Sequence, residues 1–183
     1  MADSLQGQLL IAAPTLEDPN FHRTVVLVCV HSNQGALGVV LNRPSPLEAG
    51  EAVPEVAAAL GEGAGARLWL GGPVQTSDIV LLADFADPGE SLLVAGDIGL
   101  VTDGAPLEEL GGRTRRLRAF LGHSGWGPGQ LDGELEREDW IVAPLEAGDP
   151  FSDDADGLWV TALEQLGGQY ALVARMPEDP SMN

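Results

Sequence analysis

The sequence predicts an α+β fold, a single domain with a large mixed β-sheet flanked by helices. The chain has 183 residues, which fits one domain over residues 1–183. Hydrophobic residues make up 44% of it, enough to build a core. Strand patterns come in neighbouring pairs with helices at irregular intervals, and this lack of a regular β-α-β alternation argues against a doubly wound sheet.

The first predicted strands form the N-terminal part of the sheet. Residues 8–13 are a short apolar run that Pro14 stops, as in a buried strand. Residues 24–32 are continuous and β-branched, which is typical of a strand covered on both faces. A turn at Asn-Gln-Gly then predicts a hairpin with residues 36–42, and Gly38 within that strand indicates a bulge or a close backbone approach.

The middle of the chain mixes the two kinds of element. Residues 51–61 have the composition of a helix that ends at a glycine, and residues 61–66 read as a loop. Strands are expected at residues 67–70 and 78–85, on either side of a Gly-Gly-Pro turn. Residues 91–103 are expected to form a further hairpin.

The last third is expected to contain a short helix at residues 106–112, strands at residues 115–122 and 140–145, and a helix at residues 158–168 that ends at glycine. Residues 169–176 fit either a last strand or a continuation of that helix, and the pattern leaves both open. The tail that follows is expected to be loose.

A further helix is predicted over residues 127–139. Pro128 suits its first turn, where no N–H is needed for the helix. Leu131 and Leu135 are four residues apart and are expected to share its buried face.

The charge of the chain narrows the choice of function. The formal net charge is −19, from 28 acidic and 9 basic residues, and every base is an arginine. The absence of lysine excludes Schiff-base chemistry on a lysine side chain. Such an acidic chain repels phosphate backbones and argues against direct DNA binding. The basic run at residues 113–118 is better explained as partial compensation of the surrounding negative charge than as a DNA-binding patch.

Sequence features also bear on location. No apolar run reaches the roughly 18 residues that a membrane span needs, so we expect no membrane association. The N-terminus lacks a basic region before its apolar run, unlike a secretory signal. The single cysteine, Cys29, fits a reducing cytoplasm. Cys29 and His31 would share a strand face, but two ligands are weak evidence for metal, and a buried core cysteine is the better interpretation. We expect neither a metal nor a cofactor.

The first candidate site lies where the apolar run of residues 35–41 meets Asn42, Arg43 and Pro44. Proline has no N–H and is expected to end the strand there, and it biases Arg43 to an extended conformation. An amide and a guanidinium at a strand end could recognise a ligand. The alternative is that Asn42 closes a turn and Arg43 pairs with an acid.

A second candidate, Gly71-Gly72-Pro73, follows the strand at residues 67–70 directly. Two glycines allow positive φ angles and leave no Cβ to keep a partner from the backbone. The alternative is an ordinary turn.

The third candidate is the stretch of residues 122–131, expected to run from strand through a tight turn to a helix whose free amides could bind an anion. Gly122 to Trp126 comes close to the nucleophile elbow G-x-S-x-G, with Trp126 in place of the last glycine. A serine hydrolase at Ser124 would also need a base and an orienting acid, and His123 on an extended strand would point the other way.

Taken together in their order, these stretches resemble the AlgH/YqgE family of bacterial proteins. The matching segments are LIAAPTLEDPNFHRTVVLVCVHSNQGALGVVLNRP, LWLGGPVQ and FLGHSGWGPGQLDGELEREDWIVAP. The resemblance covers a core of about residues 5–176 and implies an α+β domain with a mixed sheet in a bacterial, cytoplasmic protein. It implies no reaction. The label of transcriptional regulator comes from the family name alone.

We interpret the three stretches as walls of one ligand-binding pocket. Its predicted members are Asn42, Arg43, Pro44, Gly71, Gly72, Pro73, Ser124, Gly125, Trp126 and Gln130. Glycine, amide and guanidinium groups without a complete catalytic constellation suit recognition better than turnover. We therefore expect a non-enzymatic regulatory protein that binds an unknown small molecule or protein partner. The alternatives are an enzyme that uses Ser124 or Arg43, and a protein-interaction domain whose motifs only stabilise the fold.

Overall fold

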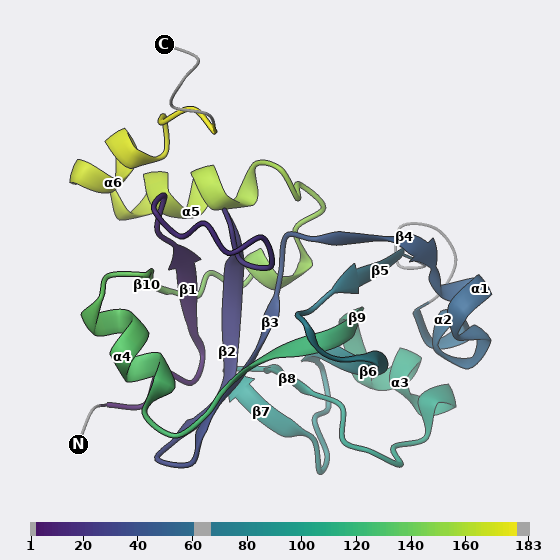
Figure 1. Ribbon diagram of the computed structural model, residues 1–183. Coiled ribbons are helices and arrows are strands. Elements are labelled where there is room, and N and C mark those ends of the chain that lie inside the picture. Colours follow the sequence, from purple (N-terminus) through teal and green to yellow (C-terminus); the bar gives the residue numbers. More distant parts are fainter. Residues whose placement is uncertain (1–2, 61–66, 179–183) are drawn as a thin grey trace.

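The computed structural model describes residues 3–60 and 67–178 (Figure 1). These residues form ten strands in one sheet, with helices around it, which confirms the predicted α+β class. The strands are β1 (Gln8–Ala12), β2 (Val25–Ser32), β3 (Gly35–Val40), β4 (Pro44–Glu48), β5 (Arg67–Leu70), β6 (Val74–Phe85), β7 (Leu92–Ala95), β8 (Ile98–Leu100), β9 (Thr114–Trp126) and β10 (Trp140–Pro144). The helices are α1 (Ala49–Ala52), α2 (Pro54–Leu60), α3 (Leu107–Arg113), α4 (Gln130–Glu136), the short 3₁₀ helix η2 (Asp149–Phe151), α5 (Leu158–Leu166) and α6 (Gly168–Val173).

The sheet is organised around the long strand β9. Its main order is β10-β1-β2-β3-β9-β6-β8-β7, and β4 and β5 form a branch that also pairs with β9. The pairings are antiparallel except for β5 with β9, which run parallel, so the sheet is mixed as predicted. Because β9 pairs with β3, β5 and β6, the segments that follow β3 and β5 are brought to one place.

Three clusters of apolar side chains form the core. One cluster packs β1, β2 and β3 against α5, and its largest buried side chains include Trp69 and Trp159. The opposite face of these strands packs against α4 through Trp126, Leu131 and Trp140. The third cluster joins β5, β6 and β9 to α1, α2 and α3. The strands β2 and β3 are therefore covered on both faces, and the continuous apolar pattern of residues 24–32 is explained.

Several predicted elements are present with small shifts of boundary. The hairpin of β2 and β3 is confirmed, with a bulge between Val28 and Val30. Gly38 is a close approach, since a Cβ there would lie 2.7 Å from the carbonyl oxygen of Leu27. The hairpin β7–β8 and the helix α3 are also confirmed. The loop predicted at residues 61–66 lies outside the described residues.

The prediction of one continuous helix over residues 51–61 is wrong. It is two short helices, α1 and α2, because Pro54 interrupts the backbone hydrogen bonds. Val53, the residue before the proline, leaves the helical conformation at φ −148° and ψ 79°. The last segment, left open between strand and helix, is the helix α6. Gly167 separates it from α5, and α6 begins at Gly168; both glycines are at positive φ.

Two expectations at the candidate stretches are also wrong. Pro44 does not end the strand pairing but begins β4, opposite Trp69 in β5. A proline is tolerated there because β4 lies at an edge and pairs with β5 alone among the described strands. The strand before the third stretch does not turn at Gly122 but continues as β9 to Trp126. Helix α4 begins only at Gln130, since Gly129 at φ +71° occupies its N-cap position and Pro128 lies before its first turn.

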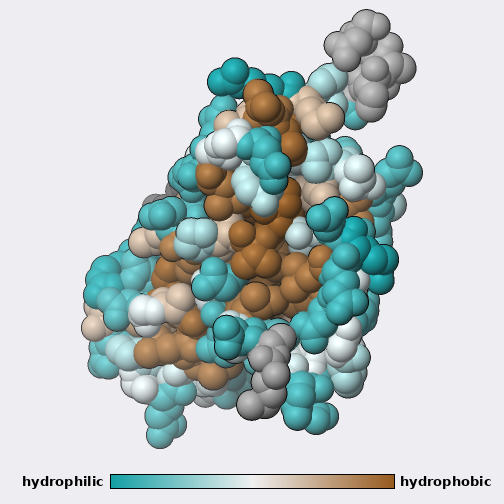
Figure 2. Space-filling view, turned by 90° about the vertical axis from the view of Figure 1, so that its left-hand side faces the viewer, coloured by the Kyte–Doolittle hydropathy of each residue, from teal (hydrophilic) through white to brown (hydrophobic). Residues whose placement is uncertain are grey.

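The side of the molecule that carries β10, α4 and α6 has a continuous hydrophobic band on its surface (Figure 2). Val142 of β10, Leu172 of α6 and Met176 are the large apolar side chains exposed in this part of the chain. No helix within residues 3–60 and 67–178 has both the length and the apolar character to cross a membrane.

Candidate functional site

The three candidate stretches meet at Gly71. Its N–H donates to the carbonyl oxygen of Leu121 at 2.8 Å, and its own carbonyl oxygen accepts from the N–H of Val40 at 2.9 Å. The hydroxyl of Ser124 donates to the same carbonyl oxygen at 3.1 Å. The Gly-Gly-Pro turn is therefore wedged between β3 and β9, where the three stretches contact one another.

Both glycines of the turn are required by this close packing. A Cβ on Gly71 or Gly72 would overlap the backbone of β9 at Gly122 or His123, and Gly72 is also at φ +153°. The backbone across from them is irregular. Gly122 has φ +67°, Gln75 has φ +47°, and the pairing of β6 with β9 shifts between Val74 and Ile79. Backbone conformations of this kind cost energy and gather at functional sites.

Beside this turn lies a cavity of about 230 Å³, here called the motif pocket. Its lining residues are Asn20, Val40, Arg43, Leu70, Gly72, Pro73, Thr76 and Leu121. Aliphatic side chains from β3, β5 and β9 make one part of the wall, and Asn20, Arg43 and Thr76 supply polar groups. Leu70 is exposed although it is apolar, with 41% of its surface open to solvent. An apolar wall with a few polar groups is the usual character of a ligand site.

Arg43 is held in place by the loop that precedes β2. It donates from Nη2 to the carbonyl oxygen of His22 at 2.8 Å and from Nη1 to that of Pro19 at 3.3 Å. This loop also supplies Asn20 to the motif pocket. Arg43 therefore fixes one wall of the pocket as well as contributing to it, and it pairs with no acid among residues 3–60 and 67–178, unlike the alternative prediction.

Asn42 is directed into the protein and not into the motif pocket. Its Oδ1 accepts from the N–H of Val25 at 3.0 Å, and its Nδ2 donates to the carbonyl oxygen of Arg23 at 2.9 Å. Arg23 is at φ +53°, in the left-handed region, so the amide of Asn42 stabilises a strained turn before β2. Asn42 therefore closes a turn, which is the alternative that the sequence left open beside ligand binding.

Three of the ten predicted residues line the motif pocket, Arg43, Gly72 and Pro73, and seven do not. Gly71 and Ser124 lie immediately behind it in the backbone contact described above. Gly125 follows in β9, opposite Leu37. Pro44 starts β4 on the other side of Arg43. The remaining two, Trp126 and Gln130, belong to a different cluster.

That cluster is centred on Glu134 of α4. Its Oε2 accepts from the indole nitrogens of Trp126 and Trp140, both at 2.8 Å, and its Oε1 accepts from Gln130 at 3.0 Å. The rings of Trp126 and Trp140 meet edge to face at 6.1 Å. Gln130 also accepts from the N–H of Gly127 through its side-chain oxygen. These residues attach α4 to the sheet, which explains their place in the motif without a ligand.

Sequence reasoning missed five lining residues of the motif pocket. Val40, Leu70 and Leu121 are adjacent to the motifs and were assigned to strands, but strand patterns do not show which face opens into a cavity. Asn20 lies in the stretch of residues 14–21 that carries part of the family resemblance, which was the one available signal. Thr76 lies in the irregular part of β6, which the sequence analysis read as a turn region before residue 78.

The structure does not give Ser124 the surroundings of a nucleophile. Its side chain is fully buried on a continuous strand, and no nucleophile elbow is present at this position. His22 and His31 are engaged elsewhere, His22 at the carbonyl oxygen of Leu16 and His31 as acceptor from the N–H of Leu5. His123 is the neighbour of Ser124 on an extended strand, so the two side chains leave it on opposite faces.

Cys29 is a buried core residue, as the sequence analysis preferred. Its surface is fully covered, and it packs in the cluster beneath α5. Burial raises the pKa of the Cys29 thiol to about 12, and a backbone hydrogen bond at Val39 only partly opposes this effect. The thiol is therefore inert at neutral pH.

Comparison with known proteins identifies the family to which this chain belongs. The fold and the motif pocket define an α+β protein whose mixed sheet is organised around one long strand and a Gly-Gly-Pro turn. The model of the AlgH-like family, DUF179, matches residues 9–171. The chain belongs to this family, and the predicted resemblance is confirmed.

Relatives and solved structures agree with this assignment. A UPF0301 protein of Streptomyces coelicolor is 42% identical, with 98% of this chain and 96% of that protein covered. A UPF0301 protein of Chlorobium luteolum is 37% identical over 97% of this chain and 94% of its own length. The crystal structure of a Corynebacterium diphtheriae protein superposes with a TM-score of 0.84 at 27% identity, covering 96% of this chain and 94% of that one. The solution structure of the AlgH protein from Pseudomonas aeruginosa has a TM-score of 0.74 at 28% identity, covering 97% and 96%.

Proposed function

We propose that this AlgH-like protein is a non-enzymatic regulatory protein that binds a small molecule, or one side chain of a peptide, in the motif pocket. The observation that carries the proposal is the convergence of the three sequence motifs on Gly71, directly behind this cavity. Strained backbone, here Gln75 at φ +47° beside the wedged Gly-Gly-Pro turn, gathers at functional sites, which supports a site held in one shape for a ligand.

The chemistry of the wall favours recognition over reaction. Val40, Leu70 and Leu121 offer apolar contact, and Arg43 and Thr76 offer polar groups at the side. Arg43 is oriented by two carbonyl oxygens, so little side-chain entropy is lost when a ligand contacts it. The hydroxyl of Ser124 is buried behind the wall and donates to Gly71, which weakens the enzyme alternative.

Direct DNA binding does not fit this proposal. The net charge of −19 repels a phosphate backbone, and Arg115, Arg116 and Arg118 of the basic run form ion pairs with acidic residues. A regulatory role would therefore act through the bound ligand or through a protein partner.

The experiment is a thermal-shift screen against small anions, nucleotides, cyclic dinucleotides, sugar acids and short peptides. A ligand at 100 times its dissociation constant stabilises the protein by about 2.7 kcal/mol, a rise of roughly 5–10 °C for a chain of this size. The variant Thr76→Trp fills the motif pocket from an exposed position and should abolish the shift. Thr161→Trp, exposed on α5, is the matched control and should leave it intact.

Two results would overturn the proposal. A ligand whose shift is unchanged in Thr76→Trp binds somewhere other than the motif pocket. A screen without any hit, together with a Thr76→Trp protein that keeps its biological effect in cells, would favour an interaction domain whose motifs only stabilise the fold.

A further inference from the structure

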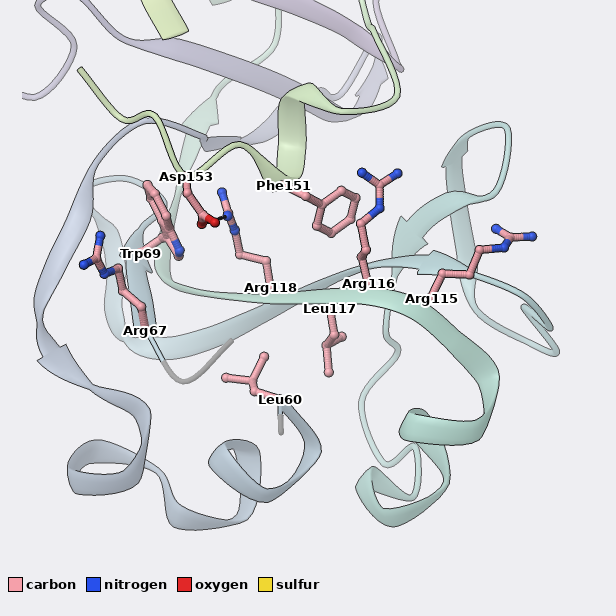
Figure 3. A pocket seen from close by; sticks show the side chains of 9 residues that line it. All are labelled: Leu60, Arg67, Trp69, Arg115, Arg116, Leu117, Arg118, Phe151 and Asp153. Carbon is pink, nitrogen blue, oxygen red and sulfur yellow. Dashed lines mark hydrogen bonds and ion pairs between the residues drawn. The ribbon is translucent and has the colours of Figure 1, made fainter. Parts of the chain in front are cut away.

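A second cavity, of about 270 Å³, gathers four of the nine arginines of the chain (Figure 3). Arg67 comes from β5, and Arg115, Arg116 and Arg118 come from β9. Figure 3 shows Arg116 and Arg118 rising from β9 toward the segment that carries Phe151 and Asp153, whereas Leu117 points the other way. Arg115 is directed away from that segment and donates to Asp84 and Asp97. In a chain of net charge −19, such a gathering of positive charge is a local exception. We call it the arginine pocket.

The parallel pairing of β5 with β9 creates this arrangement. Leu68 lies opposite Ala119, so Arg67 lies beside Arg118 at the start of the pairing. Two cations side by side on neighbouring strands destabilise the sheet. The pKa of Arg118 is lowered to about 10, mainly by burial and also by the nearby charge of Arg67, although Asp153 acts in the opposite direction. The side chain remains charged at neutral pH.

Aromatic rings hold two of the guanidinium groups in fixed planes. Arg118 lies over Trp69, with 4.1 Å between the guanidinium carbon and the ring centroid, and Arg116 lies over Phe151 at 4.6 Å. Arg118 also donates from Nη1 to the carbonyl oxygen of Ser152 at 2.8 Å. A planar fork that is already oriented loses little entropy when it binds an oxyanion.

The acidic partners of these arginines are of two kinds. Asp84 is largely buried and accepts from Arg115 and Arg116, and although burial raises its pKa, these hydrogen bonds bring the pKa below its usual range. Asp153 is different, because 72% of its side chain is exposed while only 8% of the Arg118 side chain is. Its Oδ1 accepts from Nη2 of Arg118 at 3.0 Å. Asp153 thus supplies a carboxylate from the chain itself at the rim of the pocket, on the solvent side of the buried guanidinium of Arg118.

We propose that the arginine pocket, which Arg67 and Arg118 both line, binds the phosphate or carboxylate group of a small anionic ligand in the place that the carboxylate of Asp153 occupies beside Arg118. Such an anion would remove the repulsion between the two cations and accept charge-assisted hydrogen bonds from both. Asp84, Asp97 and Asp153 pair with Arg115, Arg116 and Arg118, and Glu48 of β4 lies opposite Arg67 in register. Displacement of Asp153 therefore leaves one net positive charge among these groups to meet the ligand. The net charge of −19 repels a long polyanion more strongly than a small anion.

This site is separate from the motif pocket. Arg67 and Trp69 leave β5 on one face, and Leu70 leaves it on the other, so the two cavities lie on opposite sides of this strand. The inference therefore does not depend on the proposed function, and each can fail without the other.

The test uses sodium pyrophosphate and citrate as probes, titrated calorimetrically into the full chain at constant ionic strength. The wild type should bind at least one of them at one site. Arg67→Gln should weaken that binding at least about tenfold, since a charge-assisted contact is lost. Asp153→Asn should tighten it several-fold, because the competing carboxylate is gone. Arg67 and Asp153 are both exposed, so neither change disturbs the core.

Two controls locate the effect. Arg137→Gln removes an exposed arginine that pairs with Asp139, away from the arginine pocket, and should leave the affinity unchanged. Thr76→Trp, which blocks the motif pocket, should also leave it unchanged. In the absence of ligand, Arg67→Gln should unfold at the same temperature as the wild type or higher, because a like-charge contact is relieved.

The proposal is wrong if neither anion binds the wild type at millimolar concentration. It is equally wrong if Arg67→Gln binds as tightly as the wild type, or if Asp153→Asn binds more weakly. A loss of binding in Arg137→Gln equal to that in Arg67→Gln would show a general effect of net charge and would overturn the site as well.

Discussion

The hydroxyl of Ser124 donates to the carbonyl oxygen of Gly71 at 3.1 Å, and this contact is buried completely on the serine side. It joins the stretch that resembles a nucleophile elbow to the Gly-Gly-Pro turn. The serine therefore supports the backbone behind the motif pocket, and the sequence similarity to a hydrolase motif has a structural explanation.

Ser124→Ala should cost about 0.5–1.5 kcal/mol of the free energy of unfolding, measured by urea denaturation. The loss is modest because the carbonyl oxygen of Gly71 keeps its hydrogen bond from Val40. Ser77→Ala, at an exposed position of β6, is the control and should change stability by less than about 0.5 kcal/mol. A fluorophosphonate probe should not label Ser124 in the folded protein, and stoichiometric labelling would contradict this account.

Asn42→Ala should be more damaging, by about 2–4 kcal/mol, because two hydrogen bonds are lost and the buried N–H of Val25 keeps no partner from this side chain. The exposed Asn33→Ala provides the comparison and should be nearly neutral. Equal stability of the two variants in urea would show that Asn42 does not hold the turn before β2.

The motif glycines separate into those that need to be glycine and those that do not. Gly72→Ala should cost more than about 3 kcal/mol, since a Cβ would overlap the backbone of His123 and the φ angle of +153° disfavours alanine. Gly125→Ala has a neighbour only at 3.6 Å, the Cγ2 of Val74, and should be tolerated. Thermal unfolding of the two variants makes this comparison, and a similar midpoint for both would mean that the turn is less tightly wedged than described.

Cys29 should not react with a thiol reagent such as DTNB at pH 8 until the protein unfolds, since the thiol is buried and its pKa is raised to about 12. The same shift makes a linkage prediction. The unfolded chain ionises near the ordinary value of 9.0 and the folded one does not, so stability should fall as the pH rises from about 9 toward 12. The variant Cys29→Ala should lose this part of the pH dependence, and rapid reaction of the native wild type would refute the assignment.

The comparison between sequence and structure shows which signals could be read locally. The signals for β2, a continuous apolar run, and for α5, a helical pattern that ends at glycine, lie within the segments themselves. Both elements were therefore predicted close to their observed bounds. The three stretches have the same character, glycines and polar groups at the end of an apolar run, and in the structure they contact one another at Gly71. Pro54 was a visible signal for the break between α1 and α2, and the sequence analysis gave it too little weight.

The lining of the site could not be read in the same way. Whether Asn42 faces a cavity or the turn before β2 depends on the position of Arg23 and Val25, which is set by the whole sheet. Trp126 and Gln130 were drawn into the predicted pocket by proximity in sequence, but β9 continues past Gly122 and carries them to α4. The arginine pocket depends on the parallel register of β5 and β9, for which no local pattern exists.

The central claim, that the converged motifs form a ligand site, is tested most directly by amide chemical-shift mapping of the protein with pooled compounds from the thermal-shift panel. The account predicts that a specific ligand perturbs the amides of Asn20, Arg43, Gly72 and Leu121 together, and that Thr76→Trp abolishes these changes. Saturable binding whose perturbations leave these residues unmoved would contradict the claim and place the function elsewhere on the molecule.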